Sequence, residues 1–470
     1  HRFTDKISLT GFYLYNKSNE PCADYWEPGL NGENRFADPG DYILRRRVHV
    51  LALNNTWLPS NNTVVTLRYG LTRFKDDNTL STDFDPATLG FSSTFLNAIQ
   101  VKKFPQIRVS DYDSVDFGRM MGAIDPTQLL WKSWAANGAV SKLLGKHTIK
   151  VGGDFRAIGL DFQDYTDTAS DMRFDRFFTS STGTTNTAGN GNGFASFLLG
   201  YPSGRAGQES TMGQSSPLSI ATKYYGLYAQ DDFRVNPKLT VNYGVRLEHE
   251  DGLSEKNDSL TVAFDRGLNP GGALGAVVNP LSGQPIRGGL VYAGQNGAND
   301  YQGNPPAVKV SPRVGMVYSF NPKTVLRAGY GIYWAPWNYP PPSTTNYGQI
   351  GYNNLTLTQQ GAFIPTVTIA NPYPNGLAQP VGNSLGALTG VGTQIEFVDQ
   401  DKKAPYVHQY SVDLNRELPG NIAVGFEYAG ASGRDLGYGG SVDARLNINQ
   451  INPAVLATET AASLAQQVPN

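Results

Sequence analysis

The sequence predicts an all-β fold, a transmembrane antiparallel β-barrel of which about eleven or twelve strands are present. Three observations lead to this prediction. Strands alternate between apolar and polar residues, they occur in pairs joined by short turns, and long connections separate one pair from the next. Short turns at one end of the strands and long loops at the other are typical of bacterial outer-membrane barrels.

The clearest alternation covers residues 239–248. Every second residue is apolar, and this period of two indicates a strand with two different faces. The apolar set is Leu239, Val241, Tyr243, Val245 and Leu247, and the other set is Thr240, Asn242, Gly244, Arg246 and Glu248. Residues 326–332 and 422–428 alternate in the same way. Only a closed barrel lets strands pair every backbone group inside a membrane. In such a barrel the outward face of each strand is apolar, so we expect the apolar faces to contact lipid.

Five hairpin turns divide the chain about every 90 residues. Proline presets φ, and glycine and asparagine accept positive φ, as tight turns require. The turns lie at Pro59, Gly145, Pro237, Pro322 and Pro419, and the long connections cover residues 77–130, 163–220, 251–309 and 335–404. All five turns should lie at the periplasmic rim, with the long connections at the extracellular rim.

A soluble fold is the alternative to the barrel. Structureless loops longer than ~12–15 residues are uncommon in compact domains, which counts against it. A β-propeller would have shorter units of ~40–50 residues. A chain of β-sandwiches, or a secreted glycan-binding β-protein, would require the apolar strand faces to pack on each other.

Aromatic residues near the strand ends suit the girdles that border a bilayer. These residues are Tyr69, Trp131, Trp134, Tyr225, Tyr330 and Trp334. The connection that begins after the strand at 326–332 adds three candidates for capturing a solute, Trp334, Trp337 and Tyr339.

Charged residues on the polar strand faces are the candidates for lining a lumen. They are Arg68, Lys150, Arg246, Arg327 and Glu427. The cationic members could guide an anionic solute. The alternative is that they pair with carboxylates of the lumen or of a plug.

Catalysis and nucleic-acid binding find little support. The net charge of −2 leaves no electrostatic footprint for nucleic acid. The chain has one cysteine and five dispersed histidines, and it contains no nucleophile-elbow or phosphate-loop motif. Asp161, Asp164, Asp167 and Asp171 could bind Ca²⁺ from one loop, but the glycine and glutamate of an EF-hand are missing. We predict no enzyme activity, no cofactor and no metal.

Several segments resemble one family of membrane proteins. "YYGLYAQDDFRVNPKLTVNYGVRLE" is similar to a barrel hairpin of TonB-dependent outer-membrane receptors. "SPRVGMVYSFNPKTVLRAGYGIYW", "YVHQYSVDLNRELPGNIAVGFEYAGASGRDL", "HTIKVGGDFRAIG" and "FASFLLGYPSG" resemble its Oar-like branch. The resemblance extends from about residue 131 to 455 and implies a plug and a TonB box upstream of a 22-stranded barrel. Neither is recognisable here, so we expect residues 1–470 to be a fragment of the barrel domain.

The resemblance implies a function and partners. It implies active uptake of a scarce solute across the bacterial outer membrane, driven by a TonB complex acting through the plug region, with outer-membrane lipid around the wall. The identity of the solute is not readable. The alternative function is a passive outer-membrane channel or a surface adhesion barrel, which needs no energy coupling.

Overall fold

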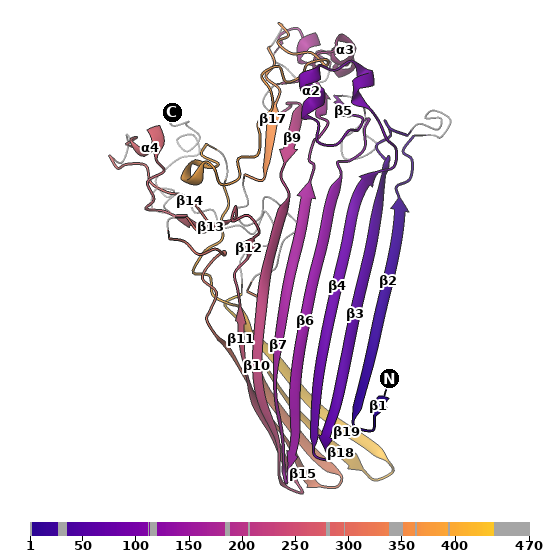
Figure 1. Cartoon of the computed structure of the whole chain (residues 1–470), viewed down its shortest axis with the longest axis vertical. Coiled ribbons are helices and arrows are strands. Elements are labelled where there is room, and N and C mark those ends of the chain that lie inside the picture. The colour runs from indigo at the N-terminus through magenta and orange to yellow at the C-terminus, as the bar shows by residue number, and fades with distance from the viewer. Residues whose placement is uncertain are drawn as a thin grey trace.

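The computed structural model describes residues 2–436 except 27–34, 111, 113–119, 184–188, 205–206, 279–282, 296, 338–350, 362–363 and 393–394. One large antiparallel sheet dominates these residues (Figure 1). Its strands, in spatial order, are β1 (Arg2–Thr4), β2 (Ile7–Pro21), β3 (Tyr42–Ser60), β4 (Thr63–Leu80), β6 (Thr127–Leu144), β7 (His147–Asp164), β10 (Leu218–Asn236), β11 (Leu239–Glu250), β15 (Lys309–Asn321), β16 (Thr324–Trp334), β18 (Tyr406–Leu418) and β19 (Ile422–Arg434). The two-residue strand β12 (Ser254–Glu255) pairs with β10.

The hairpin turns lie together at one end of this sheet. The β3–β4, β6–β7, β10–β11, β15–β16 and β18–β19 connections are each a few residues long, and Figure 1 shows these ends grouped at the bottom of a curved wall. The sequence prediction that all five turns share one rim is therefore confirmed. We call this end the turn rim and the opposite end the loop rim.

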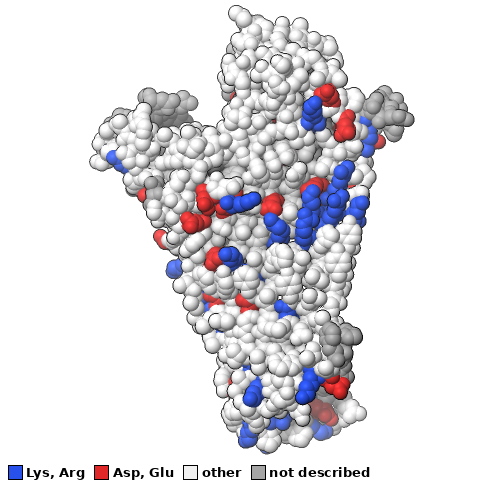
Figure 2. Space-filling view, in the orientation of Figure 1, with Lys and Arg blue, Asp and Glu red and all other residues white. Residues whose placement is uncertain are grey.

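The register of the strands separates two faces. Val245 lies beside Ala229 on β10 and Pro312 on β15, and alternate residues continue this outer face across the sheet. Tyr243 and Phe426 are 47% and 67% exposed, so these side chains are not buried between two sheets. Figure 2 shows a broad uncharged area on the front wall, below a group of Lys and Arg side chains at the upper right. The predicted outward faces of 239–247, 326–332 and 422–428 are confirmed.

One residue of the predicted aromatic girdle faces the other way. Trp131 and Trp134 are three positions apart on one strand, so they point to opposite faces. Trp131 packs against an inner-face cluster that contains Leu160, Ile220 and Tyr352. The prediction that Trp131 borders lipid is therefore wrong, whereas Trp134 is on the outer face and 47% exposed.

The long connections form ordered structure at the loop rim, which the sequence analysis did not predict. We call the following part the cap: β5 (Gln106–Val109), β8 (Asp171–Phe174), β9 (Thr211–Ser215), β17 (Asn353–Leu357), α2 (Ser93–Ala98) and α3 (Gly193–Leu199). Its four strands form one sheet in the order β17-β9-β8-β5. Buried apolar residues hold it together, namely Phe91, Phe95, Ile107, Val109, Met172, Phe174, Met212 and Tyr373.

Local sequence signals mark where the two cap helices begin and where α3 ends. The Ser92 hydroxyl accepts a hydrogen bond from the Phe95 backbone N–H, and the Asn192 side chain does the same for Ala195. Gly200 closes α3 in a left-handed conformation with φ 73°, which glycine adopts without steric cost.

Smaller elements complete the described part of the loop rim. They are β13 (Thr261–Asp265), β14 (Gly289–Tyr292), α4 (Gly272–Gly275) and the 3₁₀ turns η1 (Pro86–Leu89), η2 (Phe177–Thr179) and η4 (Gly386–Leu388). Among the residues described, no helix combines the length and apolar character needed to cross a membrane.

Candidate functional site

The inner face of the wall borders an open hollow of about 950 Å³. Residues from β4 through β19 line it together, which requires the sheet to be concave on this side. The lining includes the cations Arg68, Lys150, Arg246 and Arg313 and the carboxylates Asp154 and Asp232. The hollow is therefore a polar chamber walled by strands.

Arg246 on β11 is the centre of the polar contacts in this chamber. One of its terminal nitrogens donates to Asp154 Oδ2 at 2.6 Å and to the Tyr224 hydroxyl at 2.6 Å. Its Nε donates to Glu248 Oε1 at 3.1 Å, and Ser311 donates to the other oxygen of Glu248. Arg246 and Asp154 are each 17% exposed, so their ion pair is shielded from bulk water. Charge-assisted contacts of this kind hold the guanidinium in one orientation.

A glycine makes this orientation possible. A Cβ placed on Gly226 would lie 2.6 Å from the Arg246 guanidinium, a distance that real Cβ contacts do not reach. The lack of a side chain at Gly226 thus lets the guanidinium extend across β10 towards Asp154. Gly152 has the same relation to Tyr228, whose hydroxyl would lie 2.5 Å from an added Cβ.

Cations and tyrosine rings alternate along the chamber wall. The Arg156 guanidinium lies 5.0 Å from the centre of the Tyr224 ring, and that of Arg246 lies 5.6 Å from the Tyr228 ring. Arg313 lies 4.6 Å from the Tyr333 ring, near enough for a cation–π contact. The chamber therefore presents aromatic faces and guanidinium edges, which can bind anionic or polar solutes.

The five charged residues singled out from the sequence share this inner face. Arg68, Lys150 and Arg246 line the hollow. Arg327 donates to Asp413 at 3.3 Å, and Glu427 lies beside Asp413 in the register of β18 and β19. Contact with a solute stays a prediction for all five, and the ion pairs of Arg246 and Arg327 match the alternative in which lumenal carboxylates neutralise them.

The three aromatic candidates for solute capture have different surroundings. Trp334 ends β16, packs against Tyr406 at 4.7 Å, and donates its indole N–H to the Val310 carbonyl at 2.9 Å. Trp337 is 4% exposed. Tyr339 lies outside the described residues.

Lys402 covers the Trp337 ring. Its Nζ lies 4.6 Å from the ring centre and donates to the Trp337 carbonyl. Burial lowers the pKa of Lys402 to about 8, although nearby Glu250 acts in the opposite direction. Capture of a solute by Trp337 stays a prediction.

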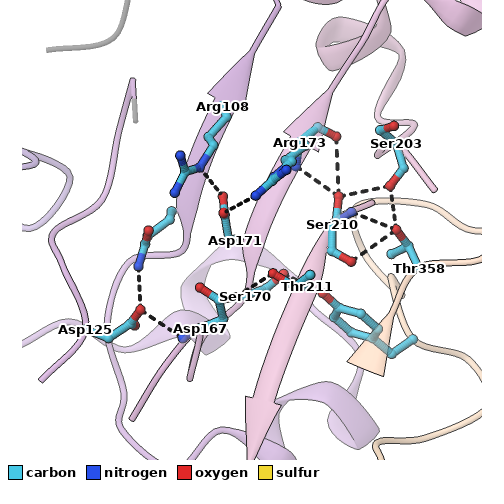
Figure 3. Close-up of polar contacts among 12 residues, drawn as sticks. Arg108, Asp125, Asp167, Ser170, Asp171, Arg173, Ser203, Ser210, Thr211 and Thr358 are labelled. Carbon is cyan, nitrogen blue, oxygen red and sulfur yellow. Dashed lines mark hydrogen bonds and ion pairs between the residues drawn. The ribbon is translucent and has the colours of Figure 1, made fainter. Parts of the chain in front are cut away.

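A second polar site lies in the cap, where hydrogen bonds join segments far apart in sequence (Figure 3). Asp171, which is buried, accepts from Arg108 Nε at 2.8 Å and from Arg173 at 3.4 Å. The Ser210 hydroxyl accepts from the Arg173 backbone, and the Ser210 N–H donates to the Thr358 hydroxyl at 3.0 Å. These contacts fix β5, β8, β9 and the chain after β17 relative to one another.

The four aspartates considered as calcium ligands do not share one loop, because Asp161 and Asp164 lie in β7. Asp161 accepts from Lys132 at 2.6 Å on the outer wall, and Asp171 is held by two arginines. Asp167 accepts from the Thr211 hydroxyl at 2.5 Å, and its backbone N–H donates to Asp125. In the part of the chain that the structure describes, no group of three or more acidic, histidine or cysteine side chains is arranged for a metal.

Asp167 makes the stability of the cap depend on pH. Burial, with the nearby carboxylates Asp125 and Asp171, raises its pKa from 3.8 to about 6, against the hydrogen bond from Thr211. Between these two values the unfolded cap has lost the proton that the folded cap still binds. Cap stability should therefore fall as the pH rises from about 4 to about 6.

Hydrogen exchange can measure this dependence. Protection factors of amides in β8 and β9, corrected for intrinsic exchange, should be higher at pH 4.5 than at pH 7. Asp167→Asn should flatten the difference, since asparagine tolerates the φ of 52° at this position and cannot ionise. An unchanged pH dependence in the variant would assign the effect to other groups.

Several chamber residues were missed as site candidates. Tyr224, Tyr228, Arg313 and Tyr333 all belong to the inner face with Arg246. The same alternation that identified Arg246 marks them, because tyrosines on the polar face of a strand are out of place in a lipid-facing pattern. Their contacts with particular cations depend on neighbouring strands.

The fold and the two-faced wall define a membrane-spanning antiparallel β-barrel wall. The sequence matches the family described as "Outer membrane beta barrel domain" over residues 1–470. The chain belongs to this family, and the protein is located in the outer membrane.

Solved structures resemble the chain at low identity. The outer membrane transporter YddB of Escherichia coli matches with 11% identity and a TM-score of 0.45, over 91% of this chain and 38% of that one. The ferric-catecholate import receptor Fiu of E. coli K12 matches with 10% identity and a TM-score of 0.37, over 90% and 49%. The siderophore receptor PiuA of Acinetobacter baumannii matches with 10% identity and a TM-score of 0.39, over 90% and 47%. The chain thus spans less than half the length of each of these proteins. Among curated proteins, no sequence matches it.

Proposed function

We propose that this chain forms part of the barrel wall of a TonB-dependent receptor of the Oar-like branch. This receptor takes up a scarce solute through the outer membrane. The observation that carries the proposal is the polar chamber of about 950 Å³ on the inner face. In this proposal the cap and the other long connections face the cell exterior and the turn rim faces the periplasm.

Closure of the barrel is part of the proposal. Among the described residues, β1 and β19 end the sheet and do not pair with each other. An unpaired strand edge in hydrocarbon leaves backbone N–H and C=O groups without partners, which costs several kcal/mol per group. Further strands of the complete receptor would pair with these edges, and its plug would gate the lumen.

The charge pattern of the chamber supports a polar or anionic solute. Arg68, Lys150 and Arg313 also line the hollow, and among the described residues none of them forms an ion pair like that of Arg246 with Asp154. A solute with carboxylate or phenolate oxygens could bind these cations and stack on the Tyr333 ring.

Two measurements on the complete protein separate active uptake from a passive channel. In planar lipid bilayers, a plugged receptor should show no steady ion conductance, and it should bind the purified periplasmic domain of TonB. A steady open conductance together with no TonB binding would contradict active uptake and establish the passive channel instead.

A further inference from the structure

The outer face of the wall carries a group of cations that the chamber does not explain. Arg45, Arg46 and Arg47 are consecutive on β3, so they alternate between the two faces. Arg46 points inward and forms ion pairs with Glu20 at 2.7 Å and Asp76 at 3.2 Å. Arg45 and Arg47 point outward and are exposed, and no carboxylate of the described residues lies within ion-pair distance of either.

The strand register extends this group across four strands. Arg47 lies beside Lys17 on β2 and Lys75 on β4. Two residues nearer the turn rim on β4, Arg73 lies beside Lys132 on β6. We call Lys17, Arg45, Arg47, Arg73, Lys75 and Lys132 the outer cation patch, and Figure 2 shows Lys and Arg side chains gathered over the upper parts of β3 and β4.

Two carboxylates share this surface. Asp77 pairs with Lys75, and Asp161 pairs with Lys132 at 2.6 Å. Six cations against two carboxylates leave the patch strongly positive. Within the described part of the chain, no ion pair neutralises Lys17, Arg45, Arg47 or Arg73.

The patch begins where the apolar band of the outer face ends. The next row towards the turn rim contains Tyr13, Leu51, Leu71 and Trp134. On β4 the apolar run from Val65 to Leu71 covers six residue steps, ~20 Å of strand at ~3.3 Å per residue. Above this row the Tyr13 hydroxyl is hydrogen bonded to His49 at 2.9 Å, as expected of amphipathic side chains at a membrane border.

We propose that the outer cation patch binds the phosphate groups of anionic lipid at the loop rim, while the adjacent apolar band contacts the acyl chains. Guanidinium groups match phosphate oxygens with two parallel hydrogen bonds, and three of the six cations are arginines. A lipid is favoured over a soluble anion because the cations border an apolar surface directly and face away from the chamber. The inference rests on the outer-membrane location and on the orientation in the proposed function, in which the loop rim faces the cell exterior, but it does not depend on TonB coupling.

Lipid binding to the complete protein in non-ionic detergent tests this proposal. The probe is diphosphorylated lipid A, the comparison is the same lipid without phosphates, and bound lipid is counted by native mass spectrometry. The test variant is Arg45→Gln/Arg47→Gln/Arg73→Gln. The matched control removes three exposed cations near the turn rim, Lys142→Gln/Lys146→Gln/Lys238→Gln. A third variant, Arg45→Lys/Arg47→Lys/Arg73→Lys, keeps the charge.

The triple glutamine variant should bind diphosphorylated lipid A roughly tenfold more weakly or worse, since each cation near an anionic surface contributes to attraction. The turn-rim control should bind normally, and the lysine variant should retain most binding. Equal binding by the glutamine variant, or equal binding of the dephosphorylated lipid, would overturn the proposal. Complete displacement of the lipid by inorganic phosphate at equal phosphate concentration would also overturn it, because the site would then be one for free anions.

Discussion

Val245→Arg should destabilise the protein by about 2–4 kcal/mol, the cost of a charge on the lipid face at the bilayer midplane. Val245 lies on the outer face of β11, 40% exposed, between Ala229 and Pro312 of the neighbouring strands. An arginine there would contact acyl chains. Its neighbours on the adjacent strands, Ala229 and Pro312, carry no carboxylate that could pair with it. The measurement is denaturant titration of the complete protein folded into lipid vesicles.

Asn242→Arg is the control on the opposite face of the same strand. Asn242 lines the chamber and donates to Asp232, so an arginine there gains a carboxylate neighbour and water. We expect a loss of less than about 1 kcal/mol. Gly244 is a poorer control, because an added Cβ would lie 2.8 Å from the Ala229 carbonyl oxygen. Equal destabilisation by Val245→Arg and Asn242→Arg would rule out a wall with one lipid face.

Phe174→Ala should lower the local stability of the cap by about 3–5 kcal/mol, through lost burial and the cavity left behind. Phe174 on β8 is 1% exposed and packs edge-on against Phe197 of α3 at 5.0 Å. Hydrogen exchange should show amides of β5, β8 and β9 losing protection. Strands β3 and β4 should keep theirs, because their hydrogen bonds belong to the main sheet.

Leu198→Ala is the matched change for this experiment. Leu198 is also apolar and lies on α3 in the same cap, but it is 71% exposed. Its truncation should change cap protection by no more than about 0.5 kcal/mol. If Phe174→Ala reduced protection in β3 and β4 as much as in β8, the cap and the wall would unfold as one unit.

The main sheet was predictable because its signals are local. A period of two in residues 239–248 sets which side chains share a face, whatever the neighbouring strands are. Proline, glycine and asparagine mark the turns through their own φ preferences. The prediction for Trp131 was wrong, because its spacing of three from Trp134 on one strand places the two side chains on opposite faces.

The cap was not predictable in the same way. Its strands are four or five residues long and come from three different connections, so each has too few residues to show a period. Its buried core joins Phe91 to Tyr373, and such contacts form only when the wall has brought the connections to one rim. Composition rich in glycine and asparagine suggested loops, and tertiary packing overrode that preference.

The sequence by itself determined the strands, their two faces, the shared rim of the turns and the inward direction of Arg246. Tertiary structure alone decided that Arg246 binds Asp154, 92 positions earlier, and that Arg47 lies between Lys17 and Lys75. The reason is physical: the direction of a side chain follows from its own backbone, whereas its partners follow from strand order and register. Those depend on the pairing of whole strands across long stretches of chain.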